Sequence, residues 1–494
     1  MSNLADLPRT WDLTSYFPSL NGPEYQAFKT ALHADLRAAL AAAAALAGLD
    51  SANVSLWVEQ FLAHEQLSAR LGHLSSYLGN VNAADADNDA AKRESAALAP
   101  AAATLSKHRG ELLRAAGATN DAIWSTLTAA PALAGAQHTL NHLRAEARHR
   151  MSRAEEALAA DLGVDGISAW GRLYENLTGQ LSFEMHWPDG RHETIPMAQR
   201  RALMANPDRA VRAAAFRQGN LVWAQHGETF AAALNAIAGT RHTFYARRGQ
   251  PDFLTRPYFD AAVSAQTIDA MFRAIAANHE LPRQALRIGA KLQGTPALAF
   301  YDLEAPRPLD PLPPLPWAEA VILVDRAFQS SYPALGAYYR DCFTRRWIES
   351  EKRANKRSGA YCTGSALTGE QRVFMTYADT MHDANTLAHE IGHAWHSHVI
   401  KDLRPSAQDY PMTLAETAST FAEKIFLHGM LQDPNLTESQ RSFLLDQECG
   451  NAASYLLNIA MRYEFEKEFY TRRRNGELSA KELCELMTRM QRNV

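Results

Sequence analysis

Two histidines separated by three residues constrain the fold of this chain more than any other feature of its sequence. Residues 386–398 read Thr-Leu-Ala-His-Glu-Ile-Gly-His-Ala-Trp-His-Ser-His, so His389 and His393 are four positions apart. On an α-helix this spacing brings both imidazoles to one face, about one turn apart, where they can share a metal ion. Glu390 stands beside the first histidine, where its carboxylate reaches a metal-bound water rather than the metal. We therefore expect a helix that presents a metal site.

The residues around the motif favour this helix and suggest what lies next to it. Thr380-Met-His-Asp383 fits a capping box at the start of the helix, with Asp379 as another possible cap. Gly392 lowers the helix propensity of the motif, and it permits the close approach of another backbone. Upstream, Ser358–Gly364 and Arg372–Tyr377 are β-prone segments joined by a glycine-containing loop. We expect them to form two strands of a small sheet beside the motif helix.

The third metal ligand must come from another element, because a hydrolytic zinc site takes three protein ligands and leaves one position for water. We expect Glu416, which begins an apolar helical pattern with small residues at 417–420 that allow close packing on the motif helix. Glu423 follows on the same face but about 10.5 Å along the axis, too far to bind the same ion. Its expected role is either to hold the second nitrogen of a ligand histidine or to pair on the surface. Other downstream carboxylates compete for the third position, namely Glu438, Glu448 and Glu464.

With one zinc ion in this site, these residues support hydrolysis by an activated water. Zinc lowers the pKa of its bound water towards neutrality and polarises a carbonyl group. Glu390 then takes a proton from the attacking water as general base and passes it to the leaving amine. Two further histidines, His382 and His396, lie seven residues from His389 on its helical stripe, and we expect them to pack or to contact substrate. We expect His398, on the opposite face, to be exposed.

Composition and charge exclude several classes of partner. The formal net charge is −4, which argues against a nucleic acid or an anionic membrane as partner, since both select basic surfaces. The longest apolar run, residues 38–47, is about half as long as a helix that crosses a bilayer. The chain starts without the basic and apolar regions of a signal peptide, and its four cysteines form no C-x-x-C pair. We therefore expect a cytoplasmic protein that does not enter a membrane.

Most of the chain is predicted to be helical and to divide into two parts. Alanine, leucine, glutamate and arginine dominate from residue 24 to about residue 130, a composition that favours helices. A β-hairpin is predicted around Pro188-Asp189-Gly190, between two short extended runs. Six prolines from Pro306 to Pro316 predict a non-helical connection. We expect an N-terminal helical lobe over residues 1–195 and a catalytic lobe over residues 196–494.

Six segments, spread in order along nearly the whole chain, share their pattern with one protein family. They are Trp11–Leu20, Phe300–Leu303, Lys356–Gly364, Thr386–His393, Glu416–Glu423 and Ala460–Glu468. In these segments the chain resembles the oligoendopeptidase F branch of the thimet-oligopeptidase family of zinc peptidases. The resemblance implies a mainly α fold, an elongated two-lobed helical zincin with a deep channel and a small β-sheet beside the zinc-binding helix.

The resemblance also implies an activity and a site. It implies a zinc-dependent endopeptidase that hydrolyses short, unstructured oligopeptides, because a folded protein cannot enter such a channel. It supports His389, His393 and Glu416 as ligands of one Zn²⁺ ion and Glu390 as the base. It also suggests that the strand around Gly359–Ala360 pairs with the substrate backbone, as an extended peptide adds to a sheet edge.

The chain departs from the family pattern at its C-terminal end. Family members continue beyond the position of Val494 with helices whose histidine and tyrosines donate hydrogen bonds to the oxyanion and the substrate. No histidine follows His428 here, and Tyr455, Tyr463 and Tyr470 lie in a segment that does not match. The sequence is therefore compatible with an active oligopeptidase or with a truncated, zinc-retaining peptide-binding form with little or no turnover. A helical scaffold with a chance motif is a third hypothesis, and it predicts no bound metal. The sequence makes no prediction of the oligomeric state.

Overall fold

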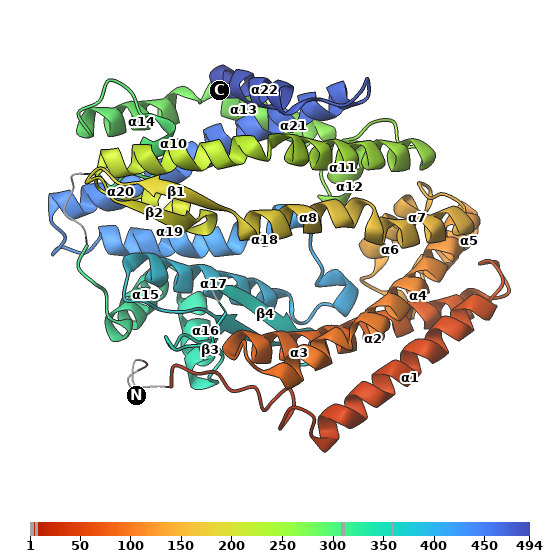
Figure 1. Cartoon of the computed structure of the whole chain (residues 1–494). Helices are drawn as coiled ribbons and strands as arrows, with labels where there is room; N and C mark the ends of the chain where they lie inside the picture. Colours follow the sequence, from red (N-terminus) through yellow and green to blue (C-terminus); the bar gives the residue numbers. More distant parts are fainter. Residues whose placement is uncertain (1–3, 5–7, 308–311, 358) are drawn as a thin grey trace. The chain divides into compact units, whose positions relative to one another are not determined.

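The computed structural model describes residues 4, 8–307, 312–357 and 359–494 of the chain (Figure 1). The chain forms two compact units, and each unit is discontinuous in the sequence. The first unit comprises Met1–Arg148 and Leu312–Leu436, and the second comprises His149–Pro311 and Thr437–Val494. The chain therefore leaves the first unit and returns to it before it enters the second unit again.

The first unit begins with long helices, whose alanine- and leucine-rich sequences favour helix formation. These are α1 (Pro23–Ala45), α2 (Val54–Ala84), α3 (Asp89–Ala96), α4 (Ala99–Ala118), α5 (Asp121–Thr128), η2 (Pro131–Leu133) and α6 (Gln137–Ala147). Leu32 and Leu36 lie one turn apart on α1 and share a buried cluster with Leu74 and Tyr77 of α2. The apolar stripe of each helix thus supplies the core of this part of the unit.

The second segment of the first unit contains a small sheet among helices. Its elements are α15 (Trp317–Ser331), α16 (Pro333–Thr344), β3 (Ile348–Glu349), β4 (Tyr361–Ser365), β5 (Glu370–Phe374), α17 (Met381–Ile400), η5 (Pro405–Ala407), α18 (Met412–Ala415) and α19 (Thr417–Leu431). The strand order is β3-β5-β4, so that β4 is an edge strand. Val373 of β5 pairs with Ile348 in the parallel direction and with Cys362 in the antiparallel direction.

Polar contacts join this sheet to the N-terminal helices. His73 of α2 forms a hydrogen bond of 2.8 Å with Ser365 of β4. The hydroxyl of Tyr361, also on β4, donates to Asn80 of α2 over 3.0 Å. Since His73 and Asn80 are both buried, these bonds satisfy the Nδ1 atom of His73 and the side-chain oxygen of Asn80, which would otherwise be costly to bury. The sheet is therefore held by a segment that lies far away in the sequence.

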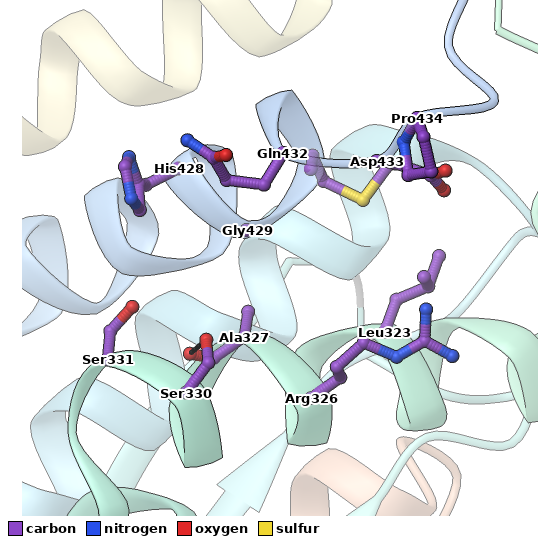
Figure 2. A pocket seen from close by; sticks show the side chains of 11 residues that line it. Leu323, Arg326, Ala327, Ser330, Ser331, His428, Gly429, Gln432, Asp433 and Pro434 are labelled. Carbon is purple, nitrogen blue, oxygen red and sulfur yellow. Dashed lines mark hydrogen bonds between the residues drawn. The ribbon is translucent and has the colours of Figure 1, made fainter.

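A cavity of about 450 Å³ lies between α15 and the end of α19 (Figure 2). Figure 2 shows residues of α15 along one wall and residues from the end of α19 along the other. The two helices approach closely here, because a Cβ added to Gly429 would stand 2.5 Å from the Cβ of Ala327. The cavity lining includes His428 but none of the residues that the sequence predicts for the metal site.

The second unit is also mostly helical, with one two-stranded hairpin. Its elements are α7 (Arg153–Asp165), α8 (Ile167–Gln180), β1 (Ser182–His186), β2 (His192–Pro196), η3 (Met197–Gln199), α9 (Arg200–Met204), α10 (Arg209–Gln225), α11 (Gly227–Arg247), α12 (Thr255–Asp260), α13 (Ala265–Ala277), α14 (Glu280–Leu292), η4 (Phe300–Asp302), α20 (Glu438–Ala453), η6 (Ser454–Asn458), α21 (Ile459–Arg473) and α22 (Ala480–Asn493). In the hairpin, Phe183 pairs with Ile195 in antiparallel register, and both side chains are buried.

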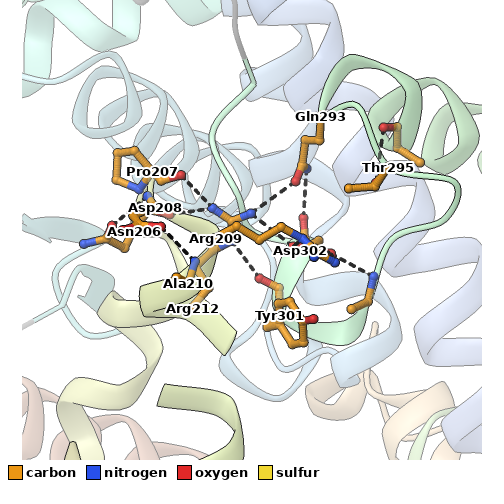
Figure 3. A network of polar contacts seen from close by, with 12 residues as sticks. Asn206, Pro207, Asp208, Arg209, Ala210, Arg212, Gln293, Thr295, Tyr301 and Asp302 are labelled. Carbon is orange, nitrogen blue, oxygen red and sulfur yellow. Dashed lines mark hydrogen bonds and ion pairs between the residues drawn. The ribbon is translucent and has the colours of Figure 1, made fainter. Parts of the chain in front are cut away.

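A buried carboxylate organises part of the second unit (Figure 3). Asp302 is 0% exposed and accepts hydrogen bonds from Arg209 at 2.9 Å and from Arg212 at 3.0 Å. The backbone N–H of Ala299 donates to it over 3.0 Å. A buried charge needs such pairing, so these arginines fix the position of the segment Phe300–Leu303. This segment of the family pattern therefore has a structural role.

Several sequence predictions can be compared with this fold. The mainly α fold with only small sheets is confirmed, as is the hairpin around Pro188-Asp189-Gly190. The units do not follow the division predicted at residue 195, which would cut through strand β2. In the proline-rich connection, residues 306, 307 and 312–316 are non-helical, and 308–311 lie outside the described residues. No helix in the described part of the chain has both the length and the hydropathy needed to cross a membrane.

Candidate active site

The predicted motif helix is α17, and its start is the predicted capping box. The Thr380 hydroxyl accepts from the backbone N–H of Asp383, and the Asp383 carboxylate accepts from the backbone N–H of Thr380, each over 3.1 Å. These two bonds satisfy donors that a helix start leaves free. Leu387 and Ile391 are fully buried one turn apart, and they fix which face of α17 turns inward.

Close packing of α17 on α19 brings the motif to Glu416. A Cβ added to Gly392 would stand 2.6 Å from the carbonyl oxygen of Ala418 and 2.6 Å from the Cα of Ser419. Only glycine allows these backbones to approach so closely, and the prediction made for Gly392 is thereby confirmed. The fully buried Ser419 donates its hydroxyl to a carboxylate oxygen of Glu416 over 2.7 Å, which orients that carboxylate.

Three candidate ligand atoms form a nearly equilateral triangle. His389 Nε2 lies 3.2 Å from His393 Nε2 and 3.2 Å from Glu416 Oε2, and His393 Nε2 lies 3.3 Å from Glu416 Oε2. Tetrahedral zinc with bonds of about 2.0–2.1 Å places its ligand atoms about 3.3 Å apart. The separations of these three ligand atoms therefore match those around one tetrahedral zinc ion. Of the competing carboxylates, Glu416 is the one that joins both histidines in a group able to hold a metal ion.

Glu423 lies against the far side of the first histidine, at 2.5 Å from Glu423 Oε1 to His389 Nδ1. Burial raises the pKa of Glu423, but hydrogen bonds from His389 and Asn385 outweigh burial and hold that pKa below its ordinary value. An ionised carboxylate only accepts hydrogen bonds, so the hydrogen of the neutral imidazole is held at Nδ1 and Nε2 offers its lone pair. Of the two roles expected for Glu423, this geometry fits the one in which it holds the second nitrogen of a ligand histidine.

Glu390 is buried beside the triangle, with only 5% of its surface exposed. Among the residues that the structure describes, its Oε2 has no hydrogen-bond partner. Burial is the main reason that the pKa of Glu390 rises to about 7; His389 opposes this rise, and the charges of Glu416 and Glu423 add to it. A buried carboxylate oxygen without a partner is unusual in a folded protein, and it leaves an acceptor for a water or substrate.

The predicted substrate-binding residues lie just before the edge strand. Gly359 has a φ of 94°, a left-handed conformation that favours glycine, and Ala360 directly precedes β4. Both residues are therefore outside the paired strand, which begins at Tyr361. The predicted strand is otherwise confirmed from Tyr361 to Gly364, β4 extends one residue further to Ser365, and Ser358 lies outside the described residues.

The other histidines of α17 differ from one another in their surroundings. His382 is exposed. The prediction that His398 would be exposed is wrong, because its ring packs 4.4 Å from the ring of Tyr338 and 5.4 Å from that of Trp395. His396 stacks on Tyr410, with ring centroids 4.3 Å apart. Tyr410 was missed by the sequence reasoning, because a single loop tyrosine has no spacing pattern that marks it.

A helix with two imidazoles, packed on a second helix that supplies a carboxylate, defines a helical metal-site protein of the H-E-x-x-H class. Two models of known protein families match parts of this chain. The model of the family described as Peptidase family M3 matches residues 335–494, which include α17 and α19, and that described as Oligopeptidase F matches residues 111–183. Over these two ranges the chain is similar to the oligoendopeptidase F branch of peptidase family M3.

Curated relatives and solved structures agree with this placement. An oligoendopeptidase F homolog of Lactococcus lactis is 26% identical over 70% of this chain, and a group B oligopeptidase of Streptococcus agalactiae is 26% identical over 84%. The chain spans 57% of the length of the first relative and 69% of the second. Among solved structures, a putative peptidase from Chlamydophila abortus covers 99% of this chain with a TM-score of 0.82 at 18% identity. In that comparison 82% of the other chain is covered, and the likeness concerns the fold.

Proposed function

We propose that this chain is a zinc-dependent endopeptidase that hydrolyses short, unstructured oligopeptides. The observation that carries the proposal is the triangle of His389, His393 and Glu416, whose ligand atoms are 3.2–3.3 Å apart. Similarity to peptidase family M3 over residues 335–494 supports the same conclusion. The relatives are named oligopeptidases and oligoendopeptidases. These names state the activity of the relatives, and the same activity is proposed here for this chain.

Each residue of the site has a role in this reaction. His389, His393 and Glu416 would hold the zinc ion, and Glu423 would keep His389 in the tautomer that binds it. Bound there, the ion would lower the pKa of water and polarise the scissile carbonyl. Glu390 takes the proton of the attacking water on its buried carboxylate and passes it to the leaving amine.

An extended peptide is the substrate form that the small sheet favours. β4 is an edge strand, and Gly359–Ala360 precede it in an exposed or half-buried stretch of backbone. A peptide that adds to such an edge gains backbone hydrogen bonds along its length, whereas a folded protein cannot supply a free strand. We therefore propose that residues around Gly359–Ala360 bind the substrate backbone.

Cleavage of an internally quenched fluorescent oligopeptide by the purified, zinc-loaded chain tests this function. We expect turnover that is abolished by a chelator and by Glu390→Gln, while the variant keeps its zinc and its fold. Glu416→Gln should lose zinc, whereas Glu438→Gln, a change at an exposed competing carboxylate, should retain both zinc and turnover. A folded, zinc-loaded chain that binds the peptide without cleaving it would instead establish the zinc-retaining peptide-binding form.

A further inference from the structure

The edge strand β4 is reached through a loop that crosses from one side of β5 to the other. This crossover loop runs from residue 350 to residue 360, and all of it except residue 358 lies within the described residues. The strand order β3-β5-β4 places its two ends on opposite sides of the central strand. Its last residues, Gly359 and Ala360, are those proposed to bind the substrate backbone. Whatever fixes the crossover loop therefore also fixes the proposed peptide-binding stretch.

Lys356 lies in the middle of this loop, and its side chain is only 2% exposed. The ammonium group donates to the carbonyl oxygen of Glu351 over 2.7 Å and to that of Met375, directly after β5, over 2.6 Å. It also pairs with a carboxylate oxygen of Glu349, the last residue of β3, over 3.1 Å. An ammonium group has three donors, so these three oxygens satisfy it and tie the loop to β3 and to the end of β5.

Backbone hydrogen bonds fasten the same part of the loop to the end of α2. The N–H of Arg357 donates to the carbonyl oxygen of Ala83 over 3.0 Å. The carbonyl oxygen of Asn355 accepts from the N–H of Ala86 over 2.6 Å. Asn355 has a φ of 59°, a left-handed conformation that asparagine adopts more readily than most residues. The residues on either side of Lys356 thus have a defined path.

Lys356 and Tyr361 hold the peptide-binding stretch from its two sides through one buried ring. That ring belongs to Phe374 of β5, which is 0% exposed. The ammonium group of Lys356 lies 4.8 Å from the ring centroid, and the ring of Tyr361 stacks on it at 5.0 Å with an angle of 19°. Between these two anchored side chains, Gly359 is exposed and Ala360 is half-buried, so the stretch can be reached from solvent.

A binding segment that is ordered in advance loses less entropy when a peptide adds to it. We propose that Lys356 is a positioning residue for the substrate: by tying the crossover loop to β3 and β5, it holds Gly359 and Ala360 ready to receive an extended peptide. The same backbone hydrogen bonds form with the bound substrate and with the transition state, so the effect falls on KM rather than on kcat. This inference rests on the proposed peptidase function and its peptide-binding stretch.

Lys356→Met in the full chain tests the role of the ammonium group, because methionine keeps most of the length of the side chain and can still pack on Phe374. We expect KM for the fluorescent oligopeptide to rise about tenfold or more, with kcat changed less than about threefold. Zinc affinity should match the wild type. Lys352→Met is the matched control, because Lys352 belongs to the same loop but is exposed, and this variant should behave as the wild type.

A general loss of stability must be separated from a loss of positioning. Lys356→Met leaves the carbonyl oxygen of the buried Met375 without this donor, so its melting temperature should fall. Leu127→Ala should lower the melting temperature at least as much, because Leu127 is 0% exposed. Its buried cluster contains no described residue of the crossover loop, so the variant should keep the KM of the wild type. The same rise in KM in Leu127→Ala would overturn the role of Lys356.

A second readout does not need turnover. On a Glu390→Gln background, which removes the proposed base, a fluorescently labelled oligopeptide can be titrated by anisotropy, and adding Lys356→Met should weaken its binding about tenfold or more. Equal KM in wild type and Lys356→Met, or equal peptide affinity in the two Glu390→Gln chains, would overturn the role of Lys356. A wild-type chain that cleaves nothing, but whose peptide affinity Lys356→Met still lowers tenfold, overturns the peptidase proposal only. A chain that neither binds nor cleaves the peptide overturns both.

Discussion

Gly392→Ala should weaken zinc binding without touching any ligand. The new Cβ would stand 2.6 Å from two backbone atoms of α19, at Ala418 and Ser419. Ordinary contacts of this kind begin near 3.4 Å. Backbone atoms cannot rotate away as a flexible side chain can, so α17 and α19 must separate by about 0.8 Å, at a cost of about 1–3 kcal/mol in stability.

The same separation enlarges the metal site. Glu416 is the N-cap residue directly before α19, so it moves with that helix away from His389 and His393. The distances from Glu416 Oε2 to the two histidine nitrogens, now 3.2 and 3.3 Å, would widen to about 4 Å, against the 3.3 Å or so that tetrahedral zinc requires. A misplacement of this size should reduce zinc affinity by about 10–100-fold, the range seen when the support of a metal site is disturbed.

Competition with a chelating dye measures that affinity, and thermal unfolding measures the stability. Gly79→Ala on α2 is the matched control, because apart from its chain neighbours and the adjacent backbone of α2, no described atom lies within 4 Å of a Cβ placed there. In that exposed helical position alanine should stabilise the protein by about 0.5–1 kcal/mol and leave zinc binding unchanged. If Gly392→Ala bound zinc as tightly as the wild type and melted at the same temperature, the packing of α17 on α19 would not be what determines the distances between the metal ligands.

Three further changes test separate parts of the structure. Glu423→Gln should lower zinc affinity by about 10–100-fold in the same dye competition while the fold is retained, because it removes the charged acceptor beside His389. Asp302→Ala should destabilise the protein by about 3–5 kcal/mol in urea unfolding, since it leaves two arginines without their buried partner. His64 and His108 lie with their Nδ1 atoms 3.2 Å apart, and burial, aided by His108, lowers the pKa of His64 to about 4. Because this folded pKa is below the unfolded value, the unfolded chain takes up the proton first, and stability should fall by up to about 3 kcal/mol as pH drops from about 6.5 to 4. Urea unfolding at several pH values should show this loss, and a His64→Gln variant with the same acid slope would contradict it.

The sequence was sufficient for those parts of the site that local rules determine. The helix around His389 and His393 follows from their spacing, and its start follows from the capping box at Thr380. Gly392 indicated a close helix contact, and small residues after Glu416 indicated which helix would make it. In each case the signal lies within a few residues of the feature it predicts.

Features that depend on distant contacts were not predictable in this way. β3 has only two residues, Ile348 and Glu349, which is too short for an alternating pattern, and it is defined by its pairing with β5. The discontinuous units depend on contacts such as that between His73 and Ser365. The loop that contains Tyr410 is held to α2 by the ion pair between Glu65 and Arg404, and no motif within the loop predicts this pair.

The order in which the first unit is synthesised has a consequence for its folding. Residues 149–311 leave the ribosome after the N-terminal helices and before the small sheet that completes their unit. Until β4 and β5 emerge, His73 and Asn80 lack the partners that they have in the folded protein, and Trp11 lacks Phe374. Contacts so distant in sequence form late and slowly, so the nascent N-terminal helices should expose apolar surface for most of translation. The nascent chain is therefore expected to engage chaperones most strongly before the metal-site helices are made.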